Sequence, residues 1–349
     1  MCTRDGLRGD FSRRGFLKTT LAGSAATIAL PAGLASLLMP AAAQAATTIK
    51  ATHGSGFCNM GIFLAQERDL AKADGVDLEF VVTPSNTEIT TMFGAGLVDI
   101  SMIPYSNFMT LYDAGAPVKI IAGGGVQGCI IVAKPGIKTA ADLKGKTFGT
   151  FQADTLEVLP YDYLKKAGLS FKDVDIKYLN TSPELAQAFM AGALDAICHI
   201  EPYASQCLSS VPGATVLTDG IDLYGAGYSD CVLAARTPPL EENPKAVKAI
   251  IKALMVAQSQ AEADKPAALK DTVGKYYKTS MEAAINASNK QPIVVDQRGQ
   301  TQFILDRGVS MKELGYVKKL PDKAAFDWSF LETVISENPD LYASLKLKS

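Results

Sequence analysis

The sequence lacks two features that would place it in common functional classes: an excess of basic charge and a pattern of metal ligands. Its 349 residues include 34 Lys and Arg against 36 Asp and Glu, which leaves a formal net charge of −2. This balance excludes the electrostatic footprint of a nucleic-acid-binding protein. Only 2 His are present, and none of the 6 Cys has the CxxC spacing of common zinc sites. No cofactor motif occurs either, so we expect no nucleic-acid partner, no metal and no cofactor.

Disorder and low complexity are excluded by the composition. Hydrophobic residues make up 48% of the chain and charged residues 20%, whereas disordered chains combine low hydrophobicity with high net charge. The 29 Gly and 17 Pro are ordinary numbers for this length. The composition therefore predicts a globular protein, and the length predicts about two domains.

The first 45 residues differ from the rest and predict an export signal. Residues 12–18 read S-R-R-G-F-L-K, a twin-arginine pattern, and a weakly apolar run follows at 19–39. The sequence A-Q-A at 43–45 fits the small-residue rule for signal cleavage. The alternative is a membrane anchor, because the run is long enough to span a bilayer. The cleavage site favours a twin-arginine signal peptide at residues 1–45, export to the periplasm, and a mature part without a membrane span.

Short apolar strands alternate with helical patterns in the following part of the chain. Predicted strands occupy residues 47–52, 76–82, 98–103, 118–122, 129–133, 147–150, 174–179 and 192–198. Between them lie helical patterns, such as the one at 60–73 and the one that Ser85 and Glu88 start with a capping-box signal. This alternation predicts an α/β fold with largely parallel strands and helices on both faces.

The C-terminal part is mostly helical, and one sequence pattern occurs twice. Helical periodicity is found at residues 246–263, 266–277, 280–288, 296–307 and 326–336. Residues 91–100 match residues 187–196: in both, a helix end is followed by Gly, a small turn, Asp and a strand. The separation of about 95 residues predicts two lobes of similar plan rather than a solenoid.

Several short motifs resemble a known family. They are G-I-F-L-A-Q-E at 61–67, G-L-V-D-I at 96–100, G-A-P-V-K at 115–119, A-D-L-K-G-K-T-F-G at 141–149, G-A-L-D-A at 192–196 and E-P-Y at 201–203. In this order they resemble the nitrate/sulfonate/taurine branch of ABC-transporter solute-binding proteins, the NMT1/THI5-like group, which also includes binders of pyrimidine precursors. The resemblance extends from about residue 49 to residue 236.

The resemblance implies a type II periplasmic-binding-protein fold, in which two α/β lobes are joined by two crossing strands and a solute is trapped in the cleft between them. Lobe one would comprise residues 46–128 plus 229–349 with the helical C-terminal tail, and lobe two residues 129–228. The crossing strands would lie at 129–133 and 228–235. Antiparallel neighbours at such a hinge would bring Cys129 near Cys231. These two residues could form a disulfide or remain buried free thiols, and the sequence leaves both alternatives open.

Ligands of open α/β sheets bind at the carboxyl ends of strands, where helix N-termini offer free N–H groups. Four loops of this kind stand out, and the resemblance adds residues after the repeated strand and at the return crossing. The candidate ligand-binding residues are Ser55, Gly56, Phe57, Cys58, Ser85, Asn86, Thr87, Tyr105, Ser106, Gln152, Asp154, Thr155, His199, Glu201 and Tyr228. Structural roles remain open for several: Ser85 and Ser106 as helix caps, Phe57 as packing, His199 as a buried imidazole.

The resemblance implies a monomeric binding component that delivers a small solute to an ABC permease and ATPase at the inner membrane. The first candidate solute is a sulfonate, taurine-like or related anion. The candidate loops contain no Lys or Arg, and Asp154 and Glu201 are possible cleft carboxylates, so a pyrimidine-type heterocycle or an aromatic acid is the alternative. A sensor subunit with the same fold is open as well. A third class is an enzyme with Cys58 as nucleophile and His53 or His199 as base. The sequence shows no third group that would orient such a base, which argues against this class.

Overall fold

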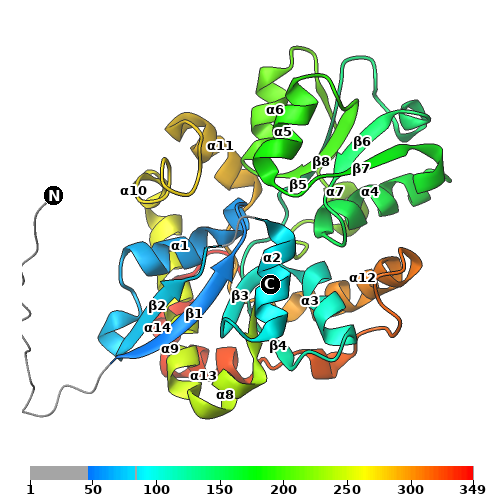
Figure 1. Ribbon diagram of the computed structural model, residues 1–349. Helices are drawn as coiled ribbons and strands as arrows, with labels where there is room; N and C mark the ends of the chain where they lie inside the picture. The colour runs from blue at the N-terminus through cyan, green and yellow to red at the C-terminus, as the bar shows by residue number, and fades with distance from the viewer. Residues whose placement is uncertain (1–45, 83–84, 349) are drawn as a thin grey trace, which may run out of the picture. The chain divides into compact units, whose positions relative to one another are not determined.

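The computed structural model describes residues 46–82 and 85–348, so the expected signal peptide at residues 1–45 lies outside the described residues. Residues 45–349 form one compact unit. It is built on two five-stranded sheets, whose strand orders are β2-β1-β3-β10-β4 and β7-β6-β8-β5-β9. Figure 1 shows the N-terminal strands of the first sheet in blue and cyan and the second sheet in green. The predicted α/β architecture is confirmed.

The two sheets have the same plan. The first contains β1 (Thr47–His53), β2 (Val76–Phe80), β3 (Ile100–Pro104), β4 (Val118–Gly123) and β10 (Cys231–Arg236). The second contains β5 (Cys129–Ala133), β6 (Thr147–Thr150), β7 (Asp175–Tyr178), β8 (Ala196–Ile200) and β9 (Thr215–Thr218). In each sheet one strand runs antiparallel to its neighbours: β10 between β3 and β4, and β5 between β8 and β9. The repeated sequence pattern leads into β3 and β8, which hold the same position in the two strand orders.

Helices cover both faces of the first sheet, as the strand sequences require. Along β10, Cys231 and Leu233 belong to one apolar cluster, whereas Val232 and Ala234 belong to another on the opposite face. Successive side chains of a strand point to opposite faces, so a strand that is apolar at every position needs cover on both sides. A third cluster surrounds the second sheet.

Helices follow several of the strands. They are α1 (Met60–Glu67), α2 (Asn86–Ala95), α3 (Tyr105–Asp113), α4 (Thr155–Lys166), α5 (Ser182–Met190), α6 (Tyr203–Ser210) and α7 (Ile221–Tyr224). The helix expected at 60–73 ends early, because Asp69 has a left-handed φ of 49° that an α-helix cannot continue through.

The C-terminal helices pack against elements of both halves of the structure, where a half means one of the two sheets with the helices around it. They are α8 (Thr237–Glu242), α9 (Pro244–Ala263), α10 (Lys265–Lys270), α11 (Met281–Lys290), α12 (Thr301–Glu313), α13 (Ser329–Glu337) and α14 (Pro339–Ser344). The helix expected at 266–277 stops at Lys270, and Gly274 with φ of 86° lies in the turn that follows. Helix α9 packs on α1, whereas α12 contacts both α3 and α4.

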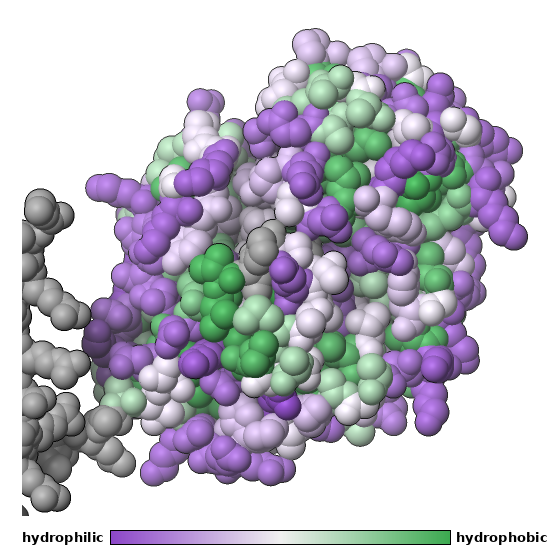
Figure 2. All heavy atoms as spheres, viewed as in Figure 1, coloured by the Kyte–Doolittle hydropathy of each residue, from purple (hydrophilic) through white to green (hydrophobic). Residues whose placement is uncertain are grey.

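The surface seen in Figure 2 is mainly hydrophilic, with apolar side chains in smaller groups. The most exposed large apolar residues are Val82 and Leu97, which are 80% and 59% exposed. None of the helices in the described part of the chain is both long and apolar enough to cross a membrane.

Candidate functional site

A cavity of about 40 Å³ lies where strand ends of both sheets meet. Strands β1, β3, β6 and β8 end there, and the antiparallel strand β10 begins there, because its first residue Cys231 pairs with Pro104 at the end of β3. This is the edge at which α/β sheets bind ligands. The lining residues are Gly54, Ser55, Gly56, Cys58, Asn59, Ile89, Thr90, Met102, Ile103, Pro104, Asn107, Phe151, Asp154, Thr155, Leu156, Ser182, Ile200, Asp230 and Cys231.

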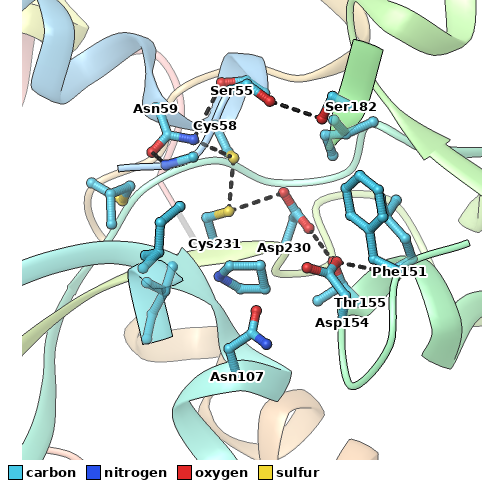
Figure 3. A pocket seen from close by; sticks show the side chains of 18 of the residues that line it. Ser55, Cys58, Asn59, Asn107, Phe151, Asp154, Thr155, Ser182, Asp230 and Cys231 are labelled. Carbon is cyan, nitrogen blue, oxygen red and sulfur yellow. Dashed lines mark hydrogen bonds between the residues drawn. The ribbon is translucent and has the colours of Figure 1, made fainter. Parts of the chain in front are cut away.

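Two hydrogen bonds join the two halves around this cavity. Ser55 Oγ lies 2.8 Å from Ser182 Oγ, which brings the loop after β1 to the start of α5 (Figure 3). Asn107 Nδ2, in the first turn of α3, donates to the carbonyl oxygen of Ala153 at 3.1 Å. Beside the cavity, the backbone N–H of Phe57 donates to the carbonyl oxygen of Glu201 at 3.0 Å. These three contacts hold elements of the first sheet beside elements of the second.

Asp230 is the centre of a buried polar cluster in the cavity wall. Its Oδ1 accepts a hydrogen bond from Thr155 Oγ1 at 2.7 Å and lies 3.3 Å from Cys129 Sγ. Its Oδ2 accepts from Gln291 Nε2 at 2.8 Å and lies 3.3 Å from Cys231 Sγ. Burial raises the pKa of this carboxyl, while its hydrogen bonds to Thr155 and the thiols act in the opposite direction.

Asp154 is a second buried carboxyl, placed by a helix start. As the N-cap of α4, its Oδ1 accepts from the N–H of Leu156 at 3.0 Å. Burial raises its pKa to about 7, and the nearby Asp230 adds to the shift. Its Oδ2 accepts no hydrogen bond within the described part of the chain, so this oxygen is available to a ligand.

The described cavity wall contains two carboxyl groups, those of Asp154 and Asp230. Among the described residues that line it, none is Lys, Arg or His. Lys290 does not line this cavity; its ammonium group forms an ion pair with Glu201 at 3.2 Å. Burial raises the pKa of Cys58 to about 11, which keeps its thiol protonated at neutral pH. The wall therefore presents carboxyl oxygens, hydroxyls, amides and thiols to an occupant.

Five of the residues predicted from the sequence come together at this cavity. They are Ser55, Gly56, Cys58, Asp154 and Thr155. Thr87 and Gln152 line a neighbouring cavity of about 250 Å³, which shares Thr90, Asn107 and Phe151 with the first.

The other predicted residues lie elsewhere. Ser85 caps α2 by accepting from the N–H of Glu88 at 3.3 Å. The side chain of Asn86, at the start of the same helix, lies outside what the structure describes. Phe57 packs on Tyr277 with ring centroids 4.3 Å apart. Tyr105 and Ser106 are buried in the first turn of α3.

The three candidates suggested by the family resemblance are buried in other networks. His199 Nε2 lies 2.9 Å from the carbonyl oxygen of Ser182, and Nδ1 accepts from the N–H of Ile200. Burial lowers the pKa of His199 to about 4, so the imidazole is neutral. Glu201 accepts from Ser205 and pairs with Lys290. The hydroxyl of Tyr228 donates to the carbonyl oxygen of Asp219 at 2.8 Å.

Several residues that line the cavity were not among the ligand-binding candidates from the sequence: Asn59, Asn107, Phe151, Ser182, Asp230 and Cys231. Asn59 and Asn107 stand in the candidate loops and carried the same signal as their neighbours. Asp230 and Cys231 are at the predicted return crossing, which is where a hinge-side ligand contact would be sought. Ser182 begins a helix in the second half, just as Ser55 precedes one in the first.

Cys129 and Cys231 do not form the disulfide that the sequence left open as one alternative. Cys58, Cys129, Cys198, Cys207 and Cys231 are all free. Cys129 and Cys231 contact different oxygens of Asp230, and the neighbour of Cys231 Sγ is Cys58 Sγ, at 2.7 Å (Figure 3). The base required by the enzyme hypothesis is missing as well, because His53 packs against Phe63 and His199 is bound to Ser182.

Relatives of the chain were found by sequence. A Brucella abortus (strain 2308) protein provisionally named a binding protein is 28% identical over 197 residues, which are 56% of this chain. The match spans 60% of the length of that relative. An Escherichia coli (strain K12) protein provisionally named an aliphatic sulfonates-binding protein is 37% identical over 127 residues, which are 36% of this chain and 37% of that protein.

The fold has solved counterparts. The crystal structure of the periplasmic aliphatic sulphonate binding protein SsuA from Escherichia coli aligns with a TM-score of 0.68 at 21% identity. The alignment covers 80% of this chain and 92% of that chain, so the two share the fold, as the sequence motifs predicted. The family model described as NMT1/THI5 like matches residues 57–268, which is more than half of the sequence. The chain therefore belongs to the NMT1/THI5-like family.

Proposed function

We propose that this protein is the periplasmic solute-binding component of an ABC importer. It captures a small organic solute between two lobes, residues 46–128 plus 229–349 and residues 129–228, and delivers it to a membrane permease and its ATPase. The observation that carries this proposal is the cavity whose wall comes from strand ends of both sheets. Contacts from a solute to both halves favour the closed state, which is how a hinged binding protein traps its ligand.

The chemistry of the wall favours a solute that donates hydrogen bonds. Asp154 and Asp230 both line the cavity, and Lys and Arg are missing from its described lining. The N–H of Leu156 near the start of α4 is taken by Asp154, and the N–H of Glu184 in α5 is taken by Thr181, so these groups do not serve an anion. A neutral or cationic heterocycle of pyrimidine type, with an amino group facing Asp154, fits these acceptors.

A sulfonate is the second candidate, because an Escherichia coli relative 37% identical over 127 residues is provisionally named for aliphatic sulfonates. Burial of a sulfonate beside Asp154 requires that carboxyl to be protonated, which its pKa of about 7 allows below neutral pH. The two candidates therefore predict opposite pH dependences. Affinity for an N–H donor rises with pH through 7, and affinity for a sulfonate falls.

A thermal-shift panel of cytosine, taurine, an alkanesulfonate and benzoate decides between the candidates, because a ligand of the native state raises the melting temperature. We expect cytosine to raise it in the wild type, and Asp154→Asn to reduce that shift. Asp175→Asn is the matched control, because Asp175 is a half-exposed residue of β7 paired with Lys177 at 2.8 Å. A shift with the sulfonates alone, enhanced by Asp154→Asn, would replace the heterocycle with the anion.

Delivery to a permease is tested separately from binding. Deletion of the gene should abolish uptake of the solute that the panel identifies, and the intact gene should restore it. Normal uptake in the deletion strain, with loss of a transcriptional response to the same solute, would assign the protein to sensing rather than transport.

A further inference from the structure

The pair Cys58 and Cys231 has no role in the solute-binding proposal, yet both thiols line the cavity. Their sulfur atoms lie 2.7 Å apart, and the side chains point toward each other in Figure 3. Both residues are buried, at 3% and 2% exposure. A disulfide bond requires about 2.05 Å between its two sulfur atoms, so a small adjustment of these two side chains would join them.

Two of the other described cysteines have oxygen atoms, not a thiol, as their recognised neighbours. Cys129 Sγ lies 3.7 Å from Thr155 Oγ1 and 3.3 Å from Asp230. Cys207 Sγ is 3.8 Å from the carbonyl oxygen of Ala186. Among the cysteines that the structure describes, Cys58 and Cys231 are the pair whose sulfur atoms lie in contact.

We infer that Cys58 and Cys231 form a reversible disulfide in the cavity wall, and that its formation raises the affinity of the cavity for a solute with N–H donors. The oxidant is a small or protein disulfide, R–S–S–R, of the kind present in oxidising compartments. One cysteine thiolate attacks this disulfide, which breaks its S–S bond and releases the first R–SH. The second thiolate attacks the mixed disulfide, forms the Cys58–Cys231 bond and releases the second R–SH. The two thiol protons of the protein end on the two R–SH molecules.

Groups around the pair fit both steps. Asn59 Nδ2 lies 3.2 Å from Cys58 Sγ and can donate to a thiolate there. Asp230 Oδ2, 3.3 Å from Cys231 Sγ, can take the thiol proton. Burial raises the pKa of both thiols, so the reaction is slow in the closed state and faster at alkaline pH or when the lobes open.

The effect on affinity follows from Asp230, and this part rests on the proposed function. The one S–H of reduced Cys231 can donate either to Asp230 Oδ2 or to Cys58 Sγ. A disulfide removes this donor, so Asp230 Oδ2 then has more capacity to accept a hydrogen bond from an occupant of the cavity. One added hydrogen bond of ordinary strength raises affinity by roughly two- to tenfold.

The test compares fully reduced protein with protein treated with oxidised glutathione. We expect the intact mass to fall by about 2 Da, the mass of two hydrogen atoms, and peptide mapping to join Cys58 to Cys231. The cross-link closes a loop of 173 residues, so we expect the melting temperature of the oxidised form to rise by roughly 5 °C. Cys58→Ser and Cys231→Ser should abolish the mass change, while Cys207→Ser, outside the cavity, should keep it.

Three outcomes would overturn the cross-link: no loss of thiols in the wild type, a linkage between other cysteines, or a stable glutathione adduct that never resolves. A fourth is protection of both thiols by Zn²⁺ without mass loss, because Cys58, Asp230 and Cys231 offer ligand atoms within 4.8 Å of one another and would then be a metal site. Cytosine titration of both forms tests the affinity change, and equal affinities would overturn it. Failure of cytosine to bind either form would count against the proposed solute class and the affinity change, while the mass measurement still decides the cross-link.

Discussion

Ser55 and Ser182 hydrogen-bond to each other at 2.8 Å, although 127 residues separate them in the sequence. Ser55 follows β1 of the first sheet, and Ser182 begins α5 beside the second. The pair thus joins elements of the two sheets across the cavity that both residues line.

Loss of this hydrogen bond should weaken solute binding more than it weakens the fold. We expect Ser55→Ala and Ser182→Ala each to reduce affinity by about two- to tenfold, because one hydrogen bond contributes about 0.5–1.5 kcal/mol to the closed state. Isothermal titration with the solute from the thermal-shift panel measures this. Ser209→Ala is the control, since the hydroxyl of the exposed Ser209 donates within its own helix, to the carbonyl oxygen of Gln206. In the double variant the losses should not add, and strict additivity would mean that the two hydroxyls act separately.

Asp154 should make the protein less stable as the pH rises. Burial raises its pKa in the folded state to about 7, above the ordinary aspartate value of 3.8, so the native state holds a proton that the unfolded state releases. Between pH 4 and 7 the stability contribution of Asp154 is therefore lost progressively. Asp154→Asn keeps the helix cap and removes the titration.

The measurement is urea unfolding of wild type and Asp154→Asn from pH 4 to 8. We expect the variant to gain stability relative to wild type as the pH rises, and to level off above pH 7. A constant difference across this range would show that Asp154 titrates alike in both states.

His199 should make the protein more stable as the pH rises, which is opposite to the effect of Asp154. Burial lowers its pKa from 6.5 to about 4, so the native state binds fewer protons than the unfolded state between these values. Stability due to His199 is present above pH 6.5 and is lost as the pH falls toward 4. We expect His199→Gln to flatten this acid-side loss, since Gln can still donate to the carbonyl oxygen of Ser182.

Acid titration of stability in the His199→Gln variant, with wild type alongside, tests this expectation. Because Asp154 and His199 have opposite slopes over the same range, the wild type alone would conceal both effects. An unchanged acid-side slope in the His199 variant would contradict a neutral buried imidazole.

Asp162 should be a stability residue that holds α12 against α4. It forms an ion pair with Arg307, and accepts hydrogen bonds from Ser310 and Tyr224, both at 2.7 Å. Its side chain is 10% exposed and that of Arg307 is 22% exposed, so removal of the carboxylate leaves a largely buried cation. We expect Asp162→Asn to lower the free energy of unfolding by about 2 kcal/mol, as measured by urea unfolding.

The half-exposed pair of Asp175 and Lys177 provides the comparison for that variant. Asp175→Asn should change the free energy of unfolding by less than about 0.5 kcal/mol, because water screens exposed charges. Equal effects of the two substitutions would indicate that burial of Asp162 does not strengthen its contacts.

The sequence by itself determined the α/β architecture, the family and the local start of several helices. Alternating apolar strands and capped helices are local patterns, and residues such as Asp154 and Ser85 form their caps with neighbours two or three positions away. The repeated Gly-to-Asp pattern also predicted two halves of similar plan, and it leads into strands with equivalent positions in the two sheets.

Only the tertiary structure decided which side chains face the cavity. His199 and Ile200 are neighbours on β8, yet Ile200 lines the cavity and His199 bonds to Ser182, because successive residues of a strand point to opposite faces. Asp230 and Cys231 reach the same cavity from far along the chain because β10 runs antiparallel beside β3. A sequence pattern fixes periodicity, whereas the face that a strand presents and the strand beside it depend on packing between distant segments.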